Sequence, residues 1–115
     1  MQPRLFDPSV LEQLLAGNRE MMGRFAHRFV ESARHALAEI DAALAAQDAH
    51  QLRHLGHRTR SAALTVGAAG MAELCARLEQ LQDLAAASPL VGDLHSAFSA
   101  TVAGLRGAGL LRPDP

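Results

Sequence analysis

The sequence predicts an all-α fold, an antiparallel up-down four-helix bundle with a short additional N-terminal helix. Alanine and leucine dominate the apolar half of the 115 residues and only four residues are aromatic, a composition that favours closely packed helices over a sheet. In four long segments apolar residues recur at intervals of three and four positions, the period of a helix with one buried face. Short breaks separate these segments, so each apolar face can be buried against the others in one bundle.

The first expected helix is short and covers about residues 8–16, with Asp7 as its cap and Pro8 in its first turn. Gly17-Asn18 ends it, and a long helix follows over about residues 19–46. The inward stripe of this long helix consists of Met22, Phe25, Ala26, Phe29, Ala33, Leu37, Ile40 and Leu44.

A third helix is expected after Gln47-Asp48, where Asp48 is placed to cap it and Gln51 to complete a capping box. Gly67 is the expected stop of this helix. Its inward residues are predicted to be Leu52, Leu55, Thr59, Ala62, Ala63 and Val66.

The fourth helix is expected over about residues 69–86, and Ser88-Pro89 reads as the cap and first turn of a fifth. The bundle then spans about residues 19–107, and residues 108–115 form a tail without a structural signal, so residues 1–115 are interpreted as a single domain. The inward residues of the fourth helix are predicted to be Met71, Leu74, Cys75, Leu78, Leu81 and Leu84.

The charge and cysteine content argue against a nucleic-acid-binding protein, a protein attracted to anionic membranes and a disulfide-stabilised protein. A net charge of −1 gives no general attraction to nucleic acid or to an anionic membrane. Cys75 is the only cysteine, so no disulfide can form within the chain and a reducing compartment is expected. No secretory signal or membrane-spanning stretch is recognisable. We therefore expect a cytoplasmic protein, or a soluble part of a larger one.

The third helix carries the most informative run, because residues 49–61 contain three histidines and three arginines and no acidic residue. The next carboxylate downstream belongs to Glu73. Imidazole is nucleophilic at neutral pH, and guanidinium groups pair with phosphate oxygens, so the run suits a phosphoryl group. A helical wheel places an outward ridge opposite the buried face, flanked by Arg53, Arg58 and Arg60. The ridge consists of His50, His54, His57, Ser61 and Leu64.

The sequence Gly-His-Arg-Thr-Arg-Ser-Ala-Ala-Leu-Thr-Val-Gly-Ala at residues 56–68, followed by residues 71–79, resembles the histidine phosphotransfer (HPt) domain family. That family's pattern is an Ala-His pair, an apolar residue, Lys-Gly, then Gly-Ala six residues on, and then a helix of the form Leu-x-x-x-x-x-Leu-Glu. The segments 24–30 and 37–48 also match, and the resemblance covers roughly residues 5–105.

The resemblance implies a role for individual residues. His57 falls on the phospho-accepting histidine, Arg60 on the family's lysine, and Gly67-Ala68 on the Gly-Ala pair. The chain departs from the pattern at three positions. Gly56 replaces the usual alanine, Thr59 replaces the usual apolar residue, and Ser61 stands where the family has the glycine that gives a partner close access.

The resemblance also implies a function. An HPt domain relays a phosphoryl group between aspartates of response-regulator receiver domains through phosphohistidine, here at His57. It is a carrier without its own turnover, and it binds no cofactor itself because Mg²⁺ is expected on the receiver. Arg60, with Arg58 and Arg53, would offset phosphate charge, and His54 and Leu64 would contribute to docking. The expected partners are receiver domains, including those of a hybrid sensor kinase, with no nucleic acid and no membrane insertion, and the chain is expected to be a monomer.

Simpler interpretations stay open at this point. A solvated helix face explains the three arginines nearly as well, and an isolated exposed histidine usually has no special role. An HPt-like bundle that is not phosphorylated and acts only as an interaction or scaffold module is the main alternative. A weaker one is a metal-binding bundle, because His50, His54 and His57 lie at helical spacing but lack a carboxylate or thiol to complete a site.

Overall fold

The computed structural model describes residues 6–111, and its regular structure there is helical, which confirms the expected all-α class. Parts of the expected single domain and tail, residues 1–5 and 112–115, lie outside the described residues. None of the helices within residues 6–111 is both long enough and apolar enough to cross a membrane. The elements in order are α1 (Ser9–Leu14), α2 (Arg19–Ala45), α3 (Ala49–Thr65), α4 (Ala69–Glu79), the 3₁₀ turn η1 (Leu84–Ala86) and α5 (Ala87–Gly107).

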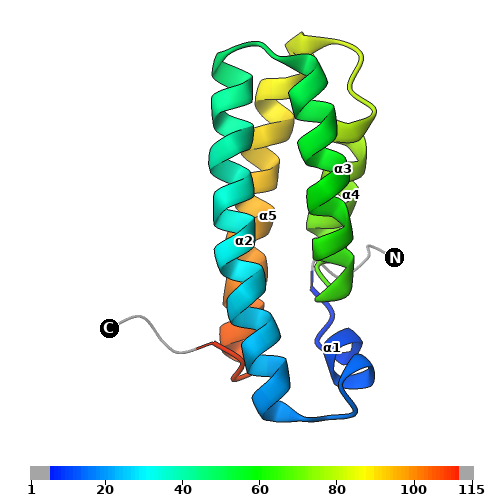
Figure 1. Cartoon of the computed structure of the whole chain (residues 1–115), viewed down its shortest axis with the longest axis vertical. Helices are drawn as coiled ribbons and strands as arrows, with labels where there is room; N and C mark the ends of the chain where they lie inside the picture. The colour runs from blue at the N-terminus through cyan, green and yellow to red at the C-terminus, as the bar shows by residue number, and fades with distance from the viewer. Residues whose placement is uncertain (1–5, 112–115) are drawn as a thin grey trace.

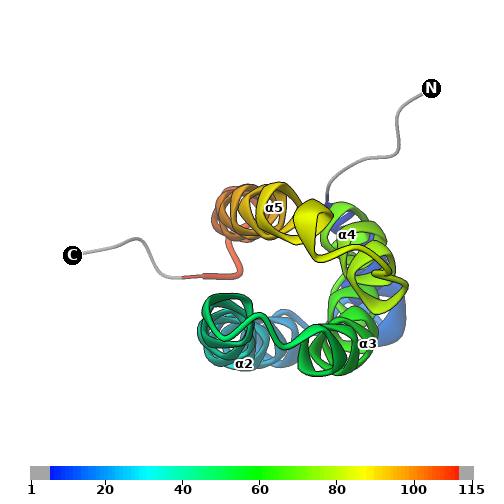
Figure 2. The ribbon, with the colours of Figure 1, turned by 90° about the horizontal axis from the view of Figure 1, so that it is seen from above.

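The four longer helices stand side by side around a common core. The chain runs upward in α2, downward in α3, upward in α4 and downward in α5 (Figure 1). Seen from above, the order around the core is α2, α3, α4, α5, with α3 between α2 and α4 (Figure 2). The short α1 lies below the end of α3 and beside the start of α2 (Figure 1). One face of α3 is therefore left to solvent along its length.

Side-chain caps fix the starts of α2 and α3. The Asp48 side chain accepts a hydrogen bond from the backbone N–H of Gln51, as expected for the start of α3. Asn18 caps α2 in the same way by accepting from Met21 N–H. The first helix is shorter than the expected residues 8–16, and the Asp7 carboxylate accepts from both the N–H and the hydroxyl of Ser9 at its start.

The expected extent of the fourth helix is wrong, because α4 ends at Glu79 and not near residue 86. The Asp83 side chain accepts from Ala85 N–H and starts the separate turn η1, an alternative to continued helix that Asp residues readily offer. Leu84 consequently lies 37% exposed instead of facing the core. The next helix begins at Ala87 with no side-chain cap, so the expected capping role of Ser88 is wrong too.

The core follows the apolar stripes, with Leu52, Leu55 and Leu78 fully buried between the helices. Cys75 is also buried, and this burial raises the pKa of its thiol to about 12. The thiol is therefore protonated at neutral pH and behaves as a small core side chain.

Gly67 shapes the connection from α3 to α4. It has a φ of +82°, a conformation that glycine adopts without steric cost. Its carbonyl accepts a hydrogen bond of 2.8 Å from Asp7 N–H, and a Cβ at this position would collide with the Asp7 carbonyl. The turn therefore ends α3 as expected and fastens the segment before α1 to the bundle.

The hydroxyl of Thr59 supports a first prediction. Thr59 is 4% exposed, and its Oγ1 has no hydrogen-bond partner among residues 6–111. A buried hydroxyl without a partner costs free energy, so Thr59→Val should raise the free energy of unfolding by about 1 kcal/mol in urea titrations. The matched control is Thr101→Val, because Thr101 is equally buried but donates to the Ala97 carbonyl at 2.8 Å. That variant should gain nothing, and equal gains in both variants would contradict the explanation.

Candidate functional site

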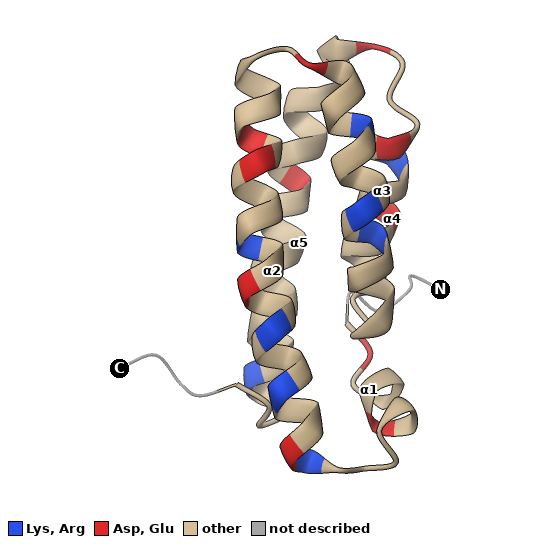
Figure 3. Cartoon of the chain, in the orientation of Figure 1, with Lys and Arg blue, Asp and Glu red and all other residues tan. Residues whose placement is uncertain are grey.

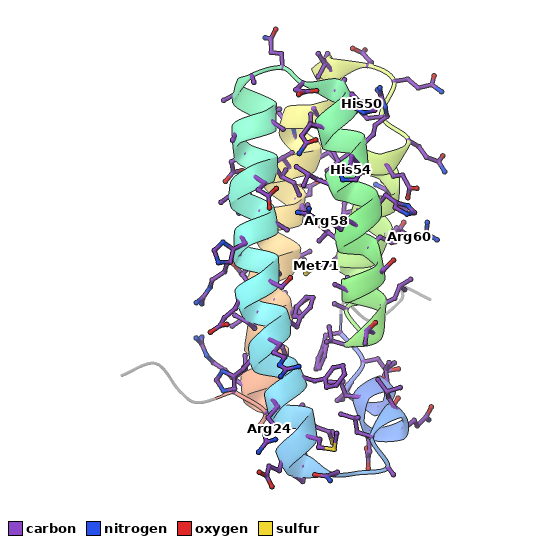
Figure 4. The ribbon with its side chains drawn as sticks, viewed as in Figure 1. Arg24, His50, His54, Arg58, Arg60 and Met71 are labelled. Atoms are coloured by element: carbon purple, nitrogen blue, oxygen red, sulfur yellow. The ribbon has the colours of Figure 1, made fainter. Side chains whose placement is uncertain are left out.

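The outward ridge of α3 lies where the sequence predicts it. All five of its residues are exposed, and the histidine side chain at position 57 is 67% exposed. His50 and His54 occupy the upper half of the helix (Figure 4). The opposite face carries Leu52 and Leu55 and is completely buried. The predicted exposure of His57 near the middle of the helix is therefore correct.

The run around His57 has no acidic residue of its own, but a carboxylate from the next helix lies beside the ring. Glu79, the last residue of α4, places its Oε1 2.7 Å from Nδ1 of the His57 ring. The two residues are 22 positions apart in the sequence and meet because α3 and α4 are antiparallel neighbours. The Glu79 side chain is 28% exposed, so the contact is at the edge of the interface between the two helices and His57 projects beyond it.

The protonation state of the pair follows from its chemistry. The hydrogen bond from His57 is the main cause that holds the pKa of Glu79 below its ordinary value, and the nearby charges of His57 and Arg60 act in the same direction. These effects outweigh partial desolvation, which raises the pKa. At neutral pH Glu79 is thus a carboxylate with no proton to donate, so Nδ1 of His57 must be the donor. In the neutral ring Nε2 then carries the lone pair.

The three arginines of the run have separate partners. Arg60 places a guanidinium nitrogen 3.3 Å from Oε2 of Glu79, so His57 and Arg60 share one carboxylate. Arg58 instead pairs with Glu39 of α2 at 2.9 Å. Figure 4 shows Arg58 on the side of α3 toward α2 and Arg60 on the opposite side. Arg53 donates to the Leu81 carbonyl at 3.2 Å, just beyond the end of α4.

The structure therefore brings only one of the three arginines into the histidine–carboxylate cluster. The supporting role expected for Arg53 and Arg58 beside His57 is not matched by their resting contacts, which tie α3 to the loop after α4 and to α2. Figure 3 shows basic residues on α3 and acidic residues on the neighbouring helices α2 and α4. The helical periodicity predicts that all three arginines flank the ridge, but it does not predict which residue of a neighbouring element each arginine contacts.

The positions that depart from the family pattern differ in their surroundings. Ser61 is exposed, one turn beyond His57, and its carbonyl accepts a hydrogen bond from Thr65. Gly56 is buried against α4, and a Cβ at this position would lie 2.8 Å from the Cys75 carbonyl oxygen. Within residues 6–111 no group of three or more His, Cys, Asp or Glu side chains is arranged to hold a metal ion, so the weaker alternative of a three-histidine metal site gains no support.

Glu79 is the functional candidate that sequence reasoning missed. Its run of helix contains no unusual motif, and the charge pattern around His57 ends well before it. The available signal is the Leu-Glu pair that closes the family's pattern, which falls on residues 78 and 79. Recognising its partner would have required the register of α4 against α3, and no local spacing provides that register.

The site therefore consists of an exposed histidine near the middle of one helix of a helical bundle. A carboxylate from the next helix forms a hydrogen bond with the ring of this histidine. Residues 24–108 match the model of the Hpt domain family, and the chain belongs to this family. The fold is similar to that of the crystal structure of histidine-containing phosphotransfer protein B (HptB) from Pseudomonas aeruginosa PAO1, with a TM-score of 0.81 and 23% sequence identity over 93% of this chain and 96% of that one. No curated protein sequence matches this chain.

The ionic contacts of Glu79 predict a pH dependence of stability. A carboxyl group whose pKa is lowered by folding stabilises the folded state above the unfolded-state pKa, and this contribution disappears as the pH falls through the folded-state pKa. Glu79→Gln should therefore have a lower Tm than the wild type near neutral pH. The two Tm values should converge as the pH falls below about 4.

Thermal unfolding followed by circular dichroism over this pH range measures the difference. The control is Glu73→Gln, which removes a carboxylate from the same helix that pairs with Arg77, one turn away. A Tm difference between wild type and Glu79→Gln that stays constant down to pH 3 would contradict the assignment.

Proposed function

We propose that this chain is a phosphoryl carrier that relays a phosphoryl group between aspartates of response-regulator receiver domains through phosphohistidine at Nε2 of His57. In this proposal α2 to α5 act as one antiparallel bundle, α1 is a short addition at its end, and residues 1–115 form a single domain. The main support is the contact between His57 Nδ1 and Glu79, because it leaves the other ring nitrogen unprotonated on a largely exposed side chain.

The proposed transfer is an in-line displacement at phosphorus. The lone pair of His57 Nε2 forms a new N–P bond while the O–P bond of the aspartyl phosphate breaks, and its electron pair returns to the aspartate carboxylate. The ring then carries a positive charge with the proton still on Nδ1, directly facing the Glu79 carboxylate at 2.7 Å. That charge pair stabilises the phosphorylated ring, and the reverse displacement passes the group to a second aspartate.

Arg60 is the proposed source of positive charge for the phosphoryl oxygens. It already lies within reach of the cluster through Glu79, and it is 46% exposed and able to turn toward a group on Nε2. Arg58 and Arg53 are given a smaller supporting role, because each is engaged by a neighbouring element in the resting state. Ser61 is small enough to leave the approach open, and its hydroxyl can donate to a phosphoryl oxygen.

The proposed docking surface is the outward ridge of α3. His54 and Leu64 belong to it, and Leu64 is 52% exposed although it is a large apolar residue. A depression of about 240 Å³ between α2 and α3 adds apolar surface from Phe25, Phe29 and Ala62 beside the ridge. An apolar patch next to a charged centre fits a protein partner that must approach closely.

The remaining parts of the proposal follow from a carrier role. The domain supplies the nucleophile and the docking surface, and the receiver supplies Mg²⁺ and most of the charge stabilisation, so the chain has no turnover of its own and binds no cofactor. A hybrid sensor kinase is one source of such a receiver. We propose that the chain acts as a cytoplasmic monomer without binding nucleic acid or inserting into a membrane.

The direct test is label transfer from ³²P-charged receiver domains. The wild type should acquire an acid-labile, base-stable label, and His57→Gln should lose it entirely because no other group takes over the nucleophile. The matched control is His95→Gln, since His95 also pairs with a carboxylate, Asp41 at 2.8 Å, but on the α5–α2 side of the bundle. It should label normally.

Label retained by His57→Gln would contradict the assignment of the acceptor. A wild type that binds a receiver but acquires no label from any charged receiver would instead favour the scaffold alternative.

The arginines give a further prediction. Arg60→Ala should slow phosphoryl uptake from the receiver about tenfold, which corresponds to the loss of one charge-assisted hydrogen bond in the transition state. Arg58→Ala should change the rate by less than about twofold, because its guanidinium is paired with Glu39. Rapid-quench measurement of label transfer provides both rates, and an equal loss in the two variants would contradict the distinction between them.

A further inference from the structure

Gly56, the residue before His57, lies where the backbones of α3 and α4 pack closely beside the site. A Cβ built on this glycine would be 2.8 Å from the Cys75 carbonyl oxygen, 2.9 Å from the Glu79 backbone nitrogen and 3.1 Å from Leu78 Cβ. Two of these three atoms belong to the backbone of α4, so no side-chain rotation can make room. A residue with a side chain at position 56 would have to push α4 away from α3.

The atoms that would move include those of the carboxylate partner. One of the close contacts is to the backbone nitrogen of Glu79 itself. Ordinary van der Waals contact begins near 3.4 Å, so α4 would have to retreat by about 0.6 Å at this level. The His57–Glu79 hydrogen bond is 2.7 Å long in the present spacing, and a retreat of this size would take it past the range of about 2.7–3.2 Å that such bonds occupy.

We propose that Gly56 is a positioning residue for the transfer reaction, an inference that rests on the proposed function: its missing side chain sets the α3–α4 spacing at which Glu79 reaches Nδ1 of His57. The spacing keeps the ring proton on Nδ1 and the lone pair on Nε2. Gly56 touches neither the phosphoryl group nor the partner and acts only through Glu79. A glycine inside a helix costs up to about 1 kcal/mol against alanine, a cost that the close approach explains here.

The test compares imidazole ¹⁵N chemical shifts in three labelled proteins. In the wild type at a pH where the ring is neutral, His57 should be protonated mainly at Nδ1. Glu79→Ala defines the shifts of a ring without its carboxylate, and Gly56→Ala should move the His57 shifts most of the way toward them. Phosphorylation by phosphoramidate should slow about tenfold in Gly56→Ala, the scale expected when a reacting group is misplaced.

The matched control is Gly92→Ala on α5. Gly92 is also a helical glycine, but a Cβ there would meet no atom within 4 Å. This variant should keep the wild-type ring shifts and phosphorylation rate and gain stability, because alanine is the better helix former. A folded Gly56→Ala protein with wild-type ring shifts would overturn the proposal, since a role limited to packing would leave the tautomer unchanged.

A second variant covers the case in which Gly56→Ala does not fold. Glu79→Asp shortens the acidic side chain by one carbon without touching the packing of α3 on α4. If the helix spacing limits the reach of the carboxylate, this variant should also lose the Nδ1-protonated ring. An aspartate that still holds the ring would show that the spacing is not limiting and would overturn the proposal.

The ring shifts also separate this inference from the proposed function. They report the His57–Glu79 contact whether or not any phosphoryl group is transferred. A wild type with the Nδ1-protonated ring that no donor phosphorylates would defeat the proposed function alone. Phosphorylation of His57 at equal rates in wild type and Gly56→Ala, with unchanged shifts, would defeat the role of Gly56 alone.

Discussion

The contact between α3 and α4 at the level of His57 is the constraint on which the site depends. Gly56 lets the two backbones approach, and Glu79 at the end of α4 then reaches around the edge of the interface to the ring. The same carboxylate contacts Arg60, so one acidic side chain orients both His57 and Arg60. Because α4 ends at Glu79, this carboxylate lies on the last turn of its helix, and no further helical turn covers it.

The arginine side chains of α3 contact the elements on both of its sides, α2 on one side and α4 with its following loop on the other. Arg58 is joined to α2, Arg53 to the loop after α4, and Arg60 to α4 itself. The contacts of Arg58 and Arg60 are exposed ion pairs, which contribute only about 0–1 kcal/mol each to stability. The main effect of these contacts is therefore to orient α3: they fix both of its flanks and leave the ridge between them exposed to solvent.

The sequence predicts the bundle well because each helix carries one continuous apolar stripe, and the burial of Leu52, Leu55 and Leu78 follows these stripes. It fails at the end of α4, where the apolar spacing continues through Leu84 but the Asp83 side chain starts a new turn. For the site, the wheel correctly exposes His57 and Leu64. The partners of His57 and Arg58 could not be predicted, because they depend on the register between packed antiparallel helices, which the spacing of residues within one helix does not determine.

The three departures from the family pattern also differ in what they do. Gly56 is explained by close packing, and Thr59 leaves an unpartnered hydroxyl in the core. Ser61 remains exposed one turn beyond the histidine, where its small size preserves access. Two of the departures therefore concern the inner side of α3, and only Ser61 alters the surface that a partner would meet.

The central claim is that phosphorylation occurs at Nε2 of His57 while Glu79 retains the proton on Nδ1. A ³¹P–¹⁵N correlation spectrum of the phosphorylated, ¹⁵N-histidine-labelled chain tests it most directly. The account predicts a single coupled ring, that of His57, with phosphorus bonded to Nε2 and a proton on Nδ1. Coupling to Nδ1 of His57, or to the ring of another histidine, would contradict it.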